Sequence, residues 1–199
     1  MSSHHIVRDE QEPAVLITEI KKDYWVSIQQ LLGWAPTVVV FEECVDEVLL
    51  AGIKIDVVIC QEGNLSALGE QLIVQQPIQF VLKTNEDPIS TAVEYLRNKA
   101  YKGVNIFGGF DPQKSLAINN RITAIWYDIS HRYILSANAQ FRKWMIKDHA
   151  FYIVSIEKNQ SYEFVNIEKL EEEHCYVCSC DGVATIRSKK DFWVGEPLS

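Results

Sequence analysis

The stretch that decides the fold is Gly52-Ile53-Lys54-Ile55-Asp56-Val57-Val58-Ile59-Cys60-Gln61-Glu62-Gly63-Asn64. It predicts an apolar β-strand over residues 55–60 that runs directly into a loop. The strand is continuously apolar rather than alternating, which is typical of a parallel sheet covered on both faces. Many α/β enzymes carry acidic groups on such a loop to hold a metal ion and phosphate. Here the loop has a single carboxylate, Glu62.

Residues on both sides of this stretch continue the same alternation of strands and helices. Apolar runs predict strands at 14–18, 37–41, 79–82 and 104–107. Helical spacing predicts helices at 24–32, at 45–49, from Pro88 onward, and through Leu116, Ile122 and Trp126. Ligands of such sheets bind beyond the carboxyl ends of the strands. Functional residues are therefore expected in the loops at 18–20, 42–43, 60–64, 83–87 and 108–114.

The chain changes character after Asn138. Short β-like runs separated by polar turns follow, at 151–154, 162–165, 175–180, 183–187 and 192–194. They predict an antiparallel domain of roughly 55–60 residues, close to the lower limit for folding alone. The expected fold is α/β, with a Rossmann-like parallel-sheet domain over 1–138 and a small all-β, sandwich-like domain over 139–199. The small domain should pack on the first domain or on a partner chain.

Composition narrows the classes of function. The chain has 199 residues and a net charge of −8, and no basic patch offsets that charge, which argues against nucleic-acid binding. No apolar run approaches the roughly 18–20 residues needed to span a bilayer. The five cysteines form a poor disulfide framework, because the count is odd and Cys44 and Cys60 are isolated. A soluble cytoplasmic protein, without nucleic-acid or membrane partners, is expected.

Several framework segments resemble the thiamine pyrophosphokinase family across nearly the whole chain. The segments are 1–14, 31–40, 52–58, 92–96 and 181–186. They resemble a divergent bacterial member with degraded catalytic motifs. The resemblance implies an α/β catalytic domain, a β-sandwich, and Mg²⁺-dependent transfer of a pyrophosphoryl group from ATP to thiamine. It also implies a homodimer that holds thiamine between the catalytic domain of one chain and the sandwich of the other.

The first two motifs of the family fall on loops that this chain has altered. An Asp-Gly pair of the family falls on Glu42-Glu43, so a side chain stands where a backbone approaches a ligand closely. A Gly-Asp-x-Asp loop falls on the loop of the opening stretch, where both aspartate positions are non-acidic, Gln61 and Gly63. Glu62 lies between them and is the remaining charge.

The later motifs are altered as well. A Thr-Asp pair ahead of a helix falls near Asp87, which replaces some charge from one position earlier. A Gly-Gly-Arg-x-Asp-His motif begins with Gly108-Gly109. Its arginine and its Asp-His pair are not recognisable in the residues that follow, which include Asp111 and Lys114.

These positions define the predicted site. The catalytic candidates are Glu62 and Asp87. The metal-binding candidates are Glu62, Asp87 and Asp111. The nucleotide-binding candidates are Glu42, Gln61, Asn64, Gly108, Gly109 and Lys114. Mg²⁺ prefers charged oxygen ligands, so we expect full-strength binding of ATP and Mg²⁺, the cofactors of an active enzyme, to be lost. The open alternative is a rearranged acidic cluster, Glu62, Glu86, Asp87 and Asp111, that still holds one ion.

Two classes of function therefore remain open. One is an enzyme that transfers a pyrophosphoryl group to thiamine or a related alcohol. The other is a non-catalytic homodimer that binds a thiamine-like small molecule or a protein. A separate cluster, His174-Cys175-x-x-Cys178-x-Cys180, has zinc-ligand residue types. Strand alternation sends Cys175 to the face opposite Cys178 and Cys180, which favours small apolar residues of a β-sandwich over a zinc site.

Overall fold

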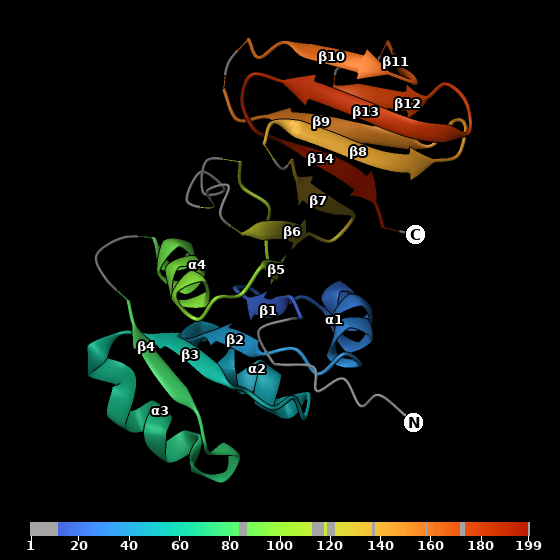
Figure 1. Cartoon of the computed structure of the whole chain (residues 1–199). Coiled ribbons are helices and arrows are strands. Elements are labelled where there is room, and N and C mark those ends of the chain that lie inside the picture. The colour runs from blue at the N-terminus through green and yellow to red at the C-terminus, as the bar shows by residue number, and fades with distance from the viewer. Residues whose placement is uncertain are drawn as a thin grey trace, which may run out of the picture. The chain divides into compact units, whose positions relative to one another are not determined.

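The structure, a computed structural model, describes residues 12–83, 87–112, 118, 122–136, 138–157, 159–171 and 174–198. Its contacts divide the chain into two compact units (Figure 1). The N-terminal unit comprises residues 1–109 and 117–124, and the C-terminal unit comprises 110–116 and 125–199. Each unit is described by itself.

The N-terminal unit is a parallel sheet with helices between its strands. Its strands are β1 (Ala14–Ile17), β2 (Val38–Phe41), β3 (Val57–Cys60), β4 (Gln79–Leu82) and β5 (Gly103–Phe107). Its α-helices are α1 (Trp25–Leu32), α2 (Val45–Leu50), α3 (Leu65–Gln71) and α4 (Pro88–Asn98). Short 3₁₀ turns occur at η2 (Lys22–Tyr24), η3 (Glu42–Cys44), η4 (Glu62–Asn64) and η5 (Ile73–Gln75). The strand order is β5-β1-β2-β3-β4, and every pair in it is parallel.

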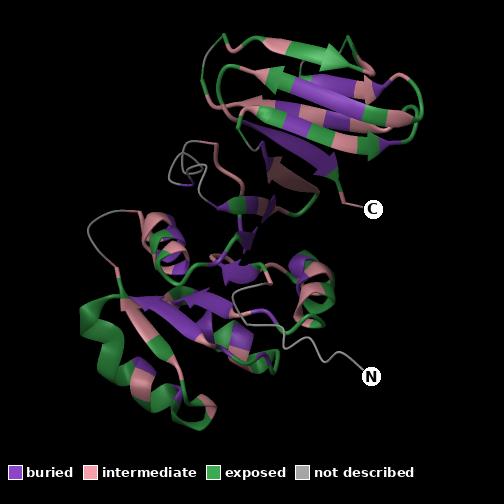
Figure 2. Ribbon diagram, in the orientation of Figure 1, coloured by how far each residue is buried: buried purple, intermediate pink, exposed green. Residues whose placement is uncertain are grey.

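Burial explains why these segments form a sheet of this kind. Every residue of β1, β2, β3 and β5 is buried, as expected for strands covered on both faces, whereas the edge strand β4 is partly exposed (Figure 2). Helix α4 begins with Asp87 as its N-cap and Pro88 in its first turn. It buries Ile89, Ala92 and Leu96 on the side that packs against β3 and β4.

The C-terminal unit is a sandwich of two antiparallel sheets. Its strands are β6 (Thr123–Tyr127), β7 (His131–Leu135), β8 (Gln140–Met145), β9 (Ala150–Ser155), β10 (Tyr162–Val165), β11 (Ile167–Lys169), β12 (Cys175–Cys178), β13 (Gly182–Ser188) and β14 (Phe192–Pro197). One sheet has the order β11-β12-β9-β14-β7-β6 and the other β10-β13-β8. Buried side chains from both sheets, including Phe141, Phe151, Ile186 and Phe192, form one core.

The predicted fold class is confirmed: a Rossmann-like parallel sheet is followed by a small all-β sandwich. The contacts separate the two units earlier than the predicted boundary between 138 and 139. The reason is that β7 pairs with β14, placing Ile134 beside Val194, so β7 belongs to the sandwich.

One predicted helix is wrong. Trp126, expected on a helix with Leu116 and Ile122, lies in strand β6; Leu116 lies outside the described residues. The β-branched and aromatic residues around Trp126 favour a strand, and this local preference outweighs the loose helical spacing. In the part of the chain that the structure describes, no helix is both long and apolar enough to cross a membrane.

Candidate functional site

All five strands of the N-terminal unit run in the same direction, so the loops that follow them meet at one edge of the sheet, the carboxyl edge. The order β2-β3-β4 places the loop after β3 between the loops after β2 and β4. Adjacent strands lie about 4.8 Å apart, so the ends of β2 and β4 are about 10 Å apart. Two long side chains reaching toward each other can span that distance.

Lys83, which follows β4, forms ion pairs with two glutamates that follow β2. The Lys83 Nζ atom lies 2.7 Å from Glu42 Oε1 and 2.7 Å from Glu43 Oε1. Glu42 and Glu43 follow β2 on η3, and Lys83 follows β4. The side chains of Glu42 and Lys83 are only 8 % and 11 % exposed, whereas that of Glu43 is 61 % exposed. The carboxyl edge therefore contains a nearly buried ion pair with a second, solvated carboxylate.

The second oxygen of Glu42 is also occupied. Glu42 Oε2 accepts hydrogen bonds from the Gln61 backbone N–H at 3.1 Å and from Asn64 Nδ2 at 2.9 Å. Burial by itself would raise the pKa of Glu42, but the hydrogen bonds from Lys83, Asn64 and Gln61 outweigh it, so the pKa of Glu42 lies below its usual value. The carboxylate stays ionised and is fully engaged by this chain's own donors.

The lysine is held in its charged form by the same contacts. Burial by itself would lower the pKa of Lys83, but its hydrogen bonds to Glu42 and Glu43 outweigh burial and raise that pKa. The neighbouring thiol of Cys60 is buried, and burial raises its pKa. Near neutral pH, Glu42 and Lys83 are therefore charged, and the Cys60 thiol stays protonated.

The glycine pair after β5, Gly108-Gly109, also contacts side chains of this chain. The Gly109 N–H donates to Glu19 Oε2 at 2.9 Å, and Glu19 Oε1 pairs with Lys21 Nζ at 3.0 Å. A Cβ on Gly108 would collide with Thr18 Oγ1, which donates to the Phe107 carbonyl at 3.0 Å. The glycine at 108 is required by its close approach to the loop after β1, and the next N–H binds a carboxylate of this chain.

The remaining predicted site residues are not gathered into one cluster. Asp87 is the N-cap of α4, where its carboxylate accepts the Ser90 N–H at 3.3 Å. Glu62 is exposed on η4. Asp111 belongs by its contacts to the C-terminal unit. Lys114 and Glu86 lie outside the described residues.

Among the described residues, no three His, Cys, Asp or Glu side chains are arranged to hold a metal ion. This finding covers the cysteine cluster as well. Cys175 and Cys178 are buried in the sandwich, and Cys180 is exposed. The Asn166 side chain contacts Cys178 Sγ at 3.3 Å and accepts from Cys180 Sγ at 2.9 Å.

A cavity of about 440 Å³ opens at the carboxyl edge beside α3. It is lined by acidic, amide and apolar side chains: Glu42, Glu43, Gln61, Asn64, Ala67, Leu68 and Gln71. Binding a phosphate needs cationic groups or free N–H donors. The lining includes no lysine or arginine, and the nearby ammonium of Lys83 is engaged by two carboxylates.

The C-terminal unit has an aromatic cavity of its own, of about 450 Å³, on the sheet that contains β7, β14 and β9. Gly195 lies between Tyr133 and Tyr152 on neighbouring strands. A Cβ at Gly195 would approach Tyr133 Cε1 to 2.8 Å, so the absent side chain leaves room for the ring. His131 and His174 complete the polar lining. Burial, followed by the nearby Asp128, raises the pKa of Tyr133 to about 12, so its hydroxyl stays protonated.

The predicted site residues do not include Lys83, Glu43 or Glu19, which the structure places in the contacts of the carboxyl edge. Lys83 and Glu19 lie in loops expected to carry function, but no role was assigned to either. The signal for Lys83 is the strand order, because only when β2 and β4 flank β3 do Glu42 and Lys83 come within reach. That order is a property of the folded chain and is not visible in local residue patterns.

No family model matches the sequence, and no curated protein matches it. Solved structures do match. A protein from Lactobacillus plantarum superimposes with a TM-score of 0.69 at 7 % identity, covering 94 % of this chain and 98 % of the other. A thiamin pyrophosphokinase from Geobacillus thermodenitrificans gives 0.67 at 7 % identity, with coverages of 94 % and 98 %. The thiamin pyrophosphokinase from Candida albicans gives 0.65 at 6 % identity, with coverages of 96 % and 90 %.

The chain has the thiamine pyrophosphokinase fold. The predicted resemblance is thereby confirmed at the level of fold, and the low identity is that of a divergent chain. Within this thiamine pyrophosphokinase fold, the edge where the resemblance places acidic metal ligands holds the Glu42–Lys83–Glu43 network instead. A shared fold does not carry activity with it, so function is argued from this edge.

Proposed function

We propose that this protein is a non-catalytic relative within the thiamine pyrophosphokinase fold, and that it binds a small aromatic molecule as a homodimer. A single observation carries the proposal: the Lys83 ammonium lies 2.7 Å from both Glu42 and Glu43. The carboxylates nearest to the expected metal position already have a cation, supplied by the chain itself.

The residues at this edge do not fit a magnesium ion. Mg²⁺ binds near-octahedrally at 2.0–2.1 Å, usually through one or two carboxylates and several waters. Glu42 would have to give up its contacts with Lys83, Asn64 and the Gln61 N–H, leaving the nearly buried ammonium with only the exposed Glu43 carboxylate. Asp87 is engaged as a helix cap. Glu62 is a single solvated carboxylate, which by itself binds Mg²⁺ weakly.

The residues at this edge also do not fit the phosphates of ATP. A glycine pair after a strand binds phosphate through free N–H groups. Here the Gly109 N–H donates to the Glu19 carboxylate, so a phosphate would meet a negative charge at the same place. Without the metal and without donors, little remains to neutralise the charge that develops in phosphoryl transfer.

The retained ligand is assigned to the aromatic cavity of the C-terminal unit. Tyr133, Tyr152, His131 and His174 line this cavity. Flat rings are held by aromatic side chains through stacking and edge contacts, while histidine supplies directional hydrogen bonds. A thiamine-like heterocycle has this combination of a flat ring and polar ring atoms. The homodimer and the cytoplasmic location inferred from the sequence are part of this proposal.

A coupled AMP-release assay with thiamine, ATP and Mg²⁺ tests the loss of catalysis, and titration calorimetry with ATP and Mg²⁺ tests the loss of nucleotide binding. We expect neither AMP release nor heat of binding. Thiamine-dependent AMP release would overturn the proposal and favour the enzyme.

A thermal-shift panel of thiamine, its phosphates and nucleotides tests the binding role. We expect thiamine or a related heterocycle to raise the melting temperature without ATP. The increase should be lost in Tyr152→Leu and retained in Tyr95→Leu, a matched change on α4 of the N-terminal unit. Absence of a shift with every member of the panel contradicts the binding role. Light scattering after gel filtration tests the dimer, and a monomer mass contradicts it.

A further inference from the structure

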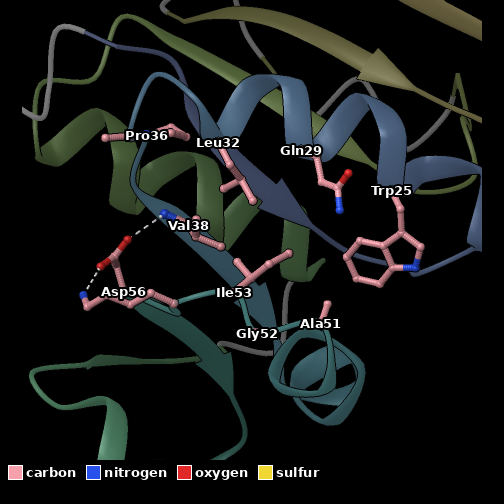
Figure 3. Close-up of a pocket in the computed structure, with 11 residues that line it drawn as sticks. Trp25, Gln29, Leu32, Pro36, Val38, Ala51, Gly52, Ile53 and Asp56 are labelled. Atoms are coloured by element: carbon pink, nitrogen blue, oxygen red, sulfur yellow. Dashed lines mark hydrogen bonds and ion pairs between the residues drawn. The ribbon is translucent and has the colours of Figure 1, made fainter.

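A cavity of the N-terminal unit lies at the edge opposite the carboxyl edge. It has a volume of about 770 Å³ and is lined by residues from α1, the chain entering β2 and the chain between α2 and β3 (Figure 3). Val38 is the first residue of β2, and Asp56 directly precedes β3. Because these strands are parallel, the cavity is at their amino ends. It shares no residue with the carboxyl edge and does not depend on the function proposed above.

One side of the cavity is apolar. Trp25, Gln29 and Leu32 recur at i, i+4 and i+7 on α1, so they lie on one helix face. Ile53 lies across from them, after Gly52, whose φ of +70° turns the chain out of α2. Among the described residues, neither the Trp25 indole N–H nor the Gln29 amide has a hydrogen-bond partner within the chain. An apolar ligand body can contact this face and still meet two free polar groups.

The other end of the cavity has one charge of each sign. Asp56 Oδ2 accepts the Val38 N–H at 2.9 Å, and Asp56 Oδ1 pairs with Lys54 Nζ at 2.5 Å. In Figure 3, Asp56 and Trp25 lie at opposite ends of the lining residues. The backbone contact fixes Asp56 at the start of β3. Lys54 is 60 % exposed, and an ammonium has three donors, so it can bind a further anion without leaving Asp56.

From this geometry we propose that the cavity binds an α-amino acid with a large apolar or aromatic side chain. The α-carboxylate accepts from Lys54, the α-ammonium donates to Asp56, and the side chain lies against Leu32, Ile53 and Trp25. A ligand with both charges adds one partner to Lys54 and one to Asp56, so that four charges alternate in sign. A ligand with one charge finds a partner on only one of these two side chains. The volume lies within the roughly 300–1,000 Å³ typical of small-molecule sites.

Calorimetry of the full chain with L-phenylalanine and L-leucine tests the proposal. The matched probes are phenethylamine, which lacks the carboxylate, and 3-phenylpropionate, which lacks the ammonium. We expect both probes to bind at least about tenfold more weakly than L-phenylalanine, because each loses a charge-assisted hydrogen bond. Glycine, which lacks the apolar side chain, should also bind more weakly.

Two lysine variants separate the cavity from general charge effects. Lys54→Met should weaken L-phenylalanine binding about tenfold or more. Lys102→Met removes the same charge from an exposed position outside the cavity and should leave binding unchanged. Trp25→Leu, checked for folding by circular dichroism, should weaken L-phenylalanine more than L-leucine.

Three outcomes would overturn the inference. The first is no heat and no thermal stabilisation with either apolar amino acid at about 10 mM, a concentration that saturates even millimolar sites. The second is binding of either singly charged probe as tightly as L-phenylalanine. The third is equal binding by Lys54→Met and the Lys102→Met control.

Discussion

Replacing Lys83 by methionine removes the ammonium between Glu42 and Glu43 while keeping an unbranched apolar stem. Removing one partner of a buried ion pair typically costs about 3–5 kcal/mol, because the other charge is left unpaired. Glu42 keeps its hydrogen bonds from Asn64 and the Gln61 N–H, and Glu43 is largely solvated. We therefore expect a smaller loss of unfolding free energy than that range, about 2–3 kcal/mol.

The loss should depend on pH in a defined direction. In the wild type, burial acts to raise the pKa of Glu42, but the hydrogen bonds from Lys83, Asn64 and Gln61 hold it below its usual value. Stability from a lowered carboxyl pKa is present above the unfolded pKa and is lost as pH falls through the folded one. Without Lys83 the burial remains, so the pKa of Glu42 rises and protonation relieves the penalty. The difference between Lys83→Met and wild type should be largest near neutral pH and shrink below about pH 5.

Urea unfolding followed by circular dichroism measures this difference, and hydrogen exchange of β3 peptides assigns it to the N-terminal unit. The matched control is Lys54→Met, which breaks an exposed ion pair and should cost about 0–1 kcal/mol. The double variant Glu42→Gln/Lys83→Met removes the uncompensated charge and should recover part of the loss. Equal, small effects of Lys83→Met and Lys54→Met, with no dependence on pH, would refute the argument for a nearly buried pair.

Three further changes test other contacts described above. Gly108→Ala should destabilise the N-terminal unit by about 1–3 kcal/mol in urea unfolding, because its Cβ has no room, whereas Gly63→Ala, where space is open, should be nearly neutral. Asp87→Ala should lower the unfolding free energy by about 1 kcal/mol through loss of the α4 cap, and Asp87→Asn, which keeps a capping oxygen, should not. In native protein at pH 8, a disulfide reagent should label the exposed Cys180 rapidly and Cys44 only on unfolding, since burial raises the pKa of Cys44 to about 12; equal labelling rates would show that the buried thiol is accessible.

Local patterns in the sequence predict the five strands of the N-terminal unit and its helices α1, α2 and α4, but not α3. The continuous apolar run before Cys60 predicted β3, and Pro88 with its following apolar face predicted α4. In both, the local preference and the burial required by the sheet agree. The described parts of the loops expected to share one edge do so, because that follows from parallel strands alone.

The details of the carboxyl edge could not be predicted in the same way. The sequence offers Glu42 and Asn64 as nucleotide-binding candidates, and the structure places both in one network, but the centre of that network is Lys83. An ion pair between residues forty positions apart depends on strand order, which single-sequence periodicity does not contain. The N–H of Gly109 likewise meets Glu19 only because β1 and β5 are neighbours.

At strand β6 a local pattern is present but predicts the wrong secondary structure. The spacing of Leu116, Ile122 and Trp126 predicts a helix, and the local pattern gives no signal for β7. Both segments are strands because β6 pairs with β7, and β7 pairs with β14, about sixty residues later in the chain. Such distant pairing overrides weak local periodicity.

The cation at the carboxyl edge, the Lys83 ammonium, is covalently part of the chain, so the charge balance of this edge does not depend on ions in solution. A covalently attached cation has a fixed local concentration that dilution does not lower. Chelators that strip divalent ions from an enzyme would leave Glu42 and Lys83 as they are. The conformation of this edge should therefore stay the same at low and at high magnesium concentration.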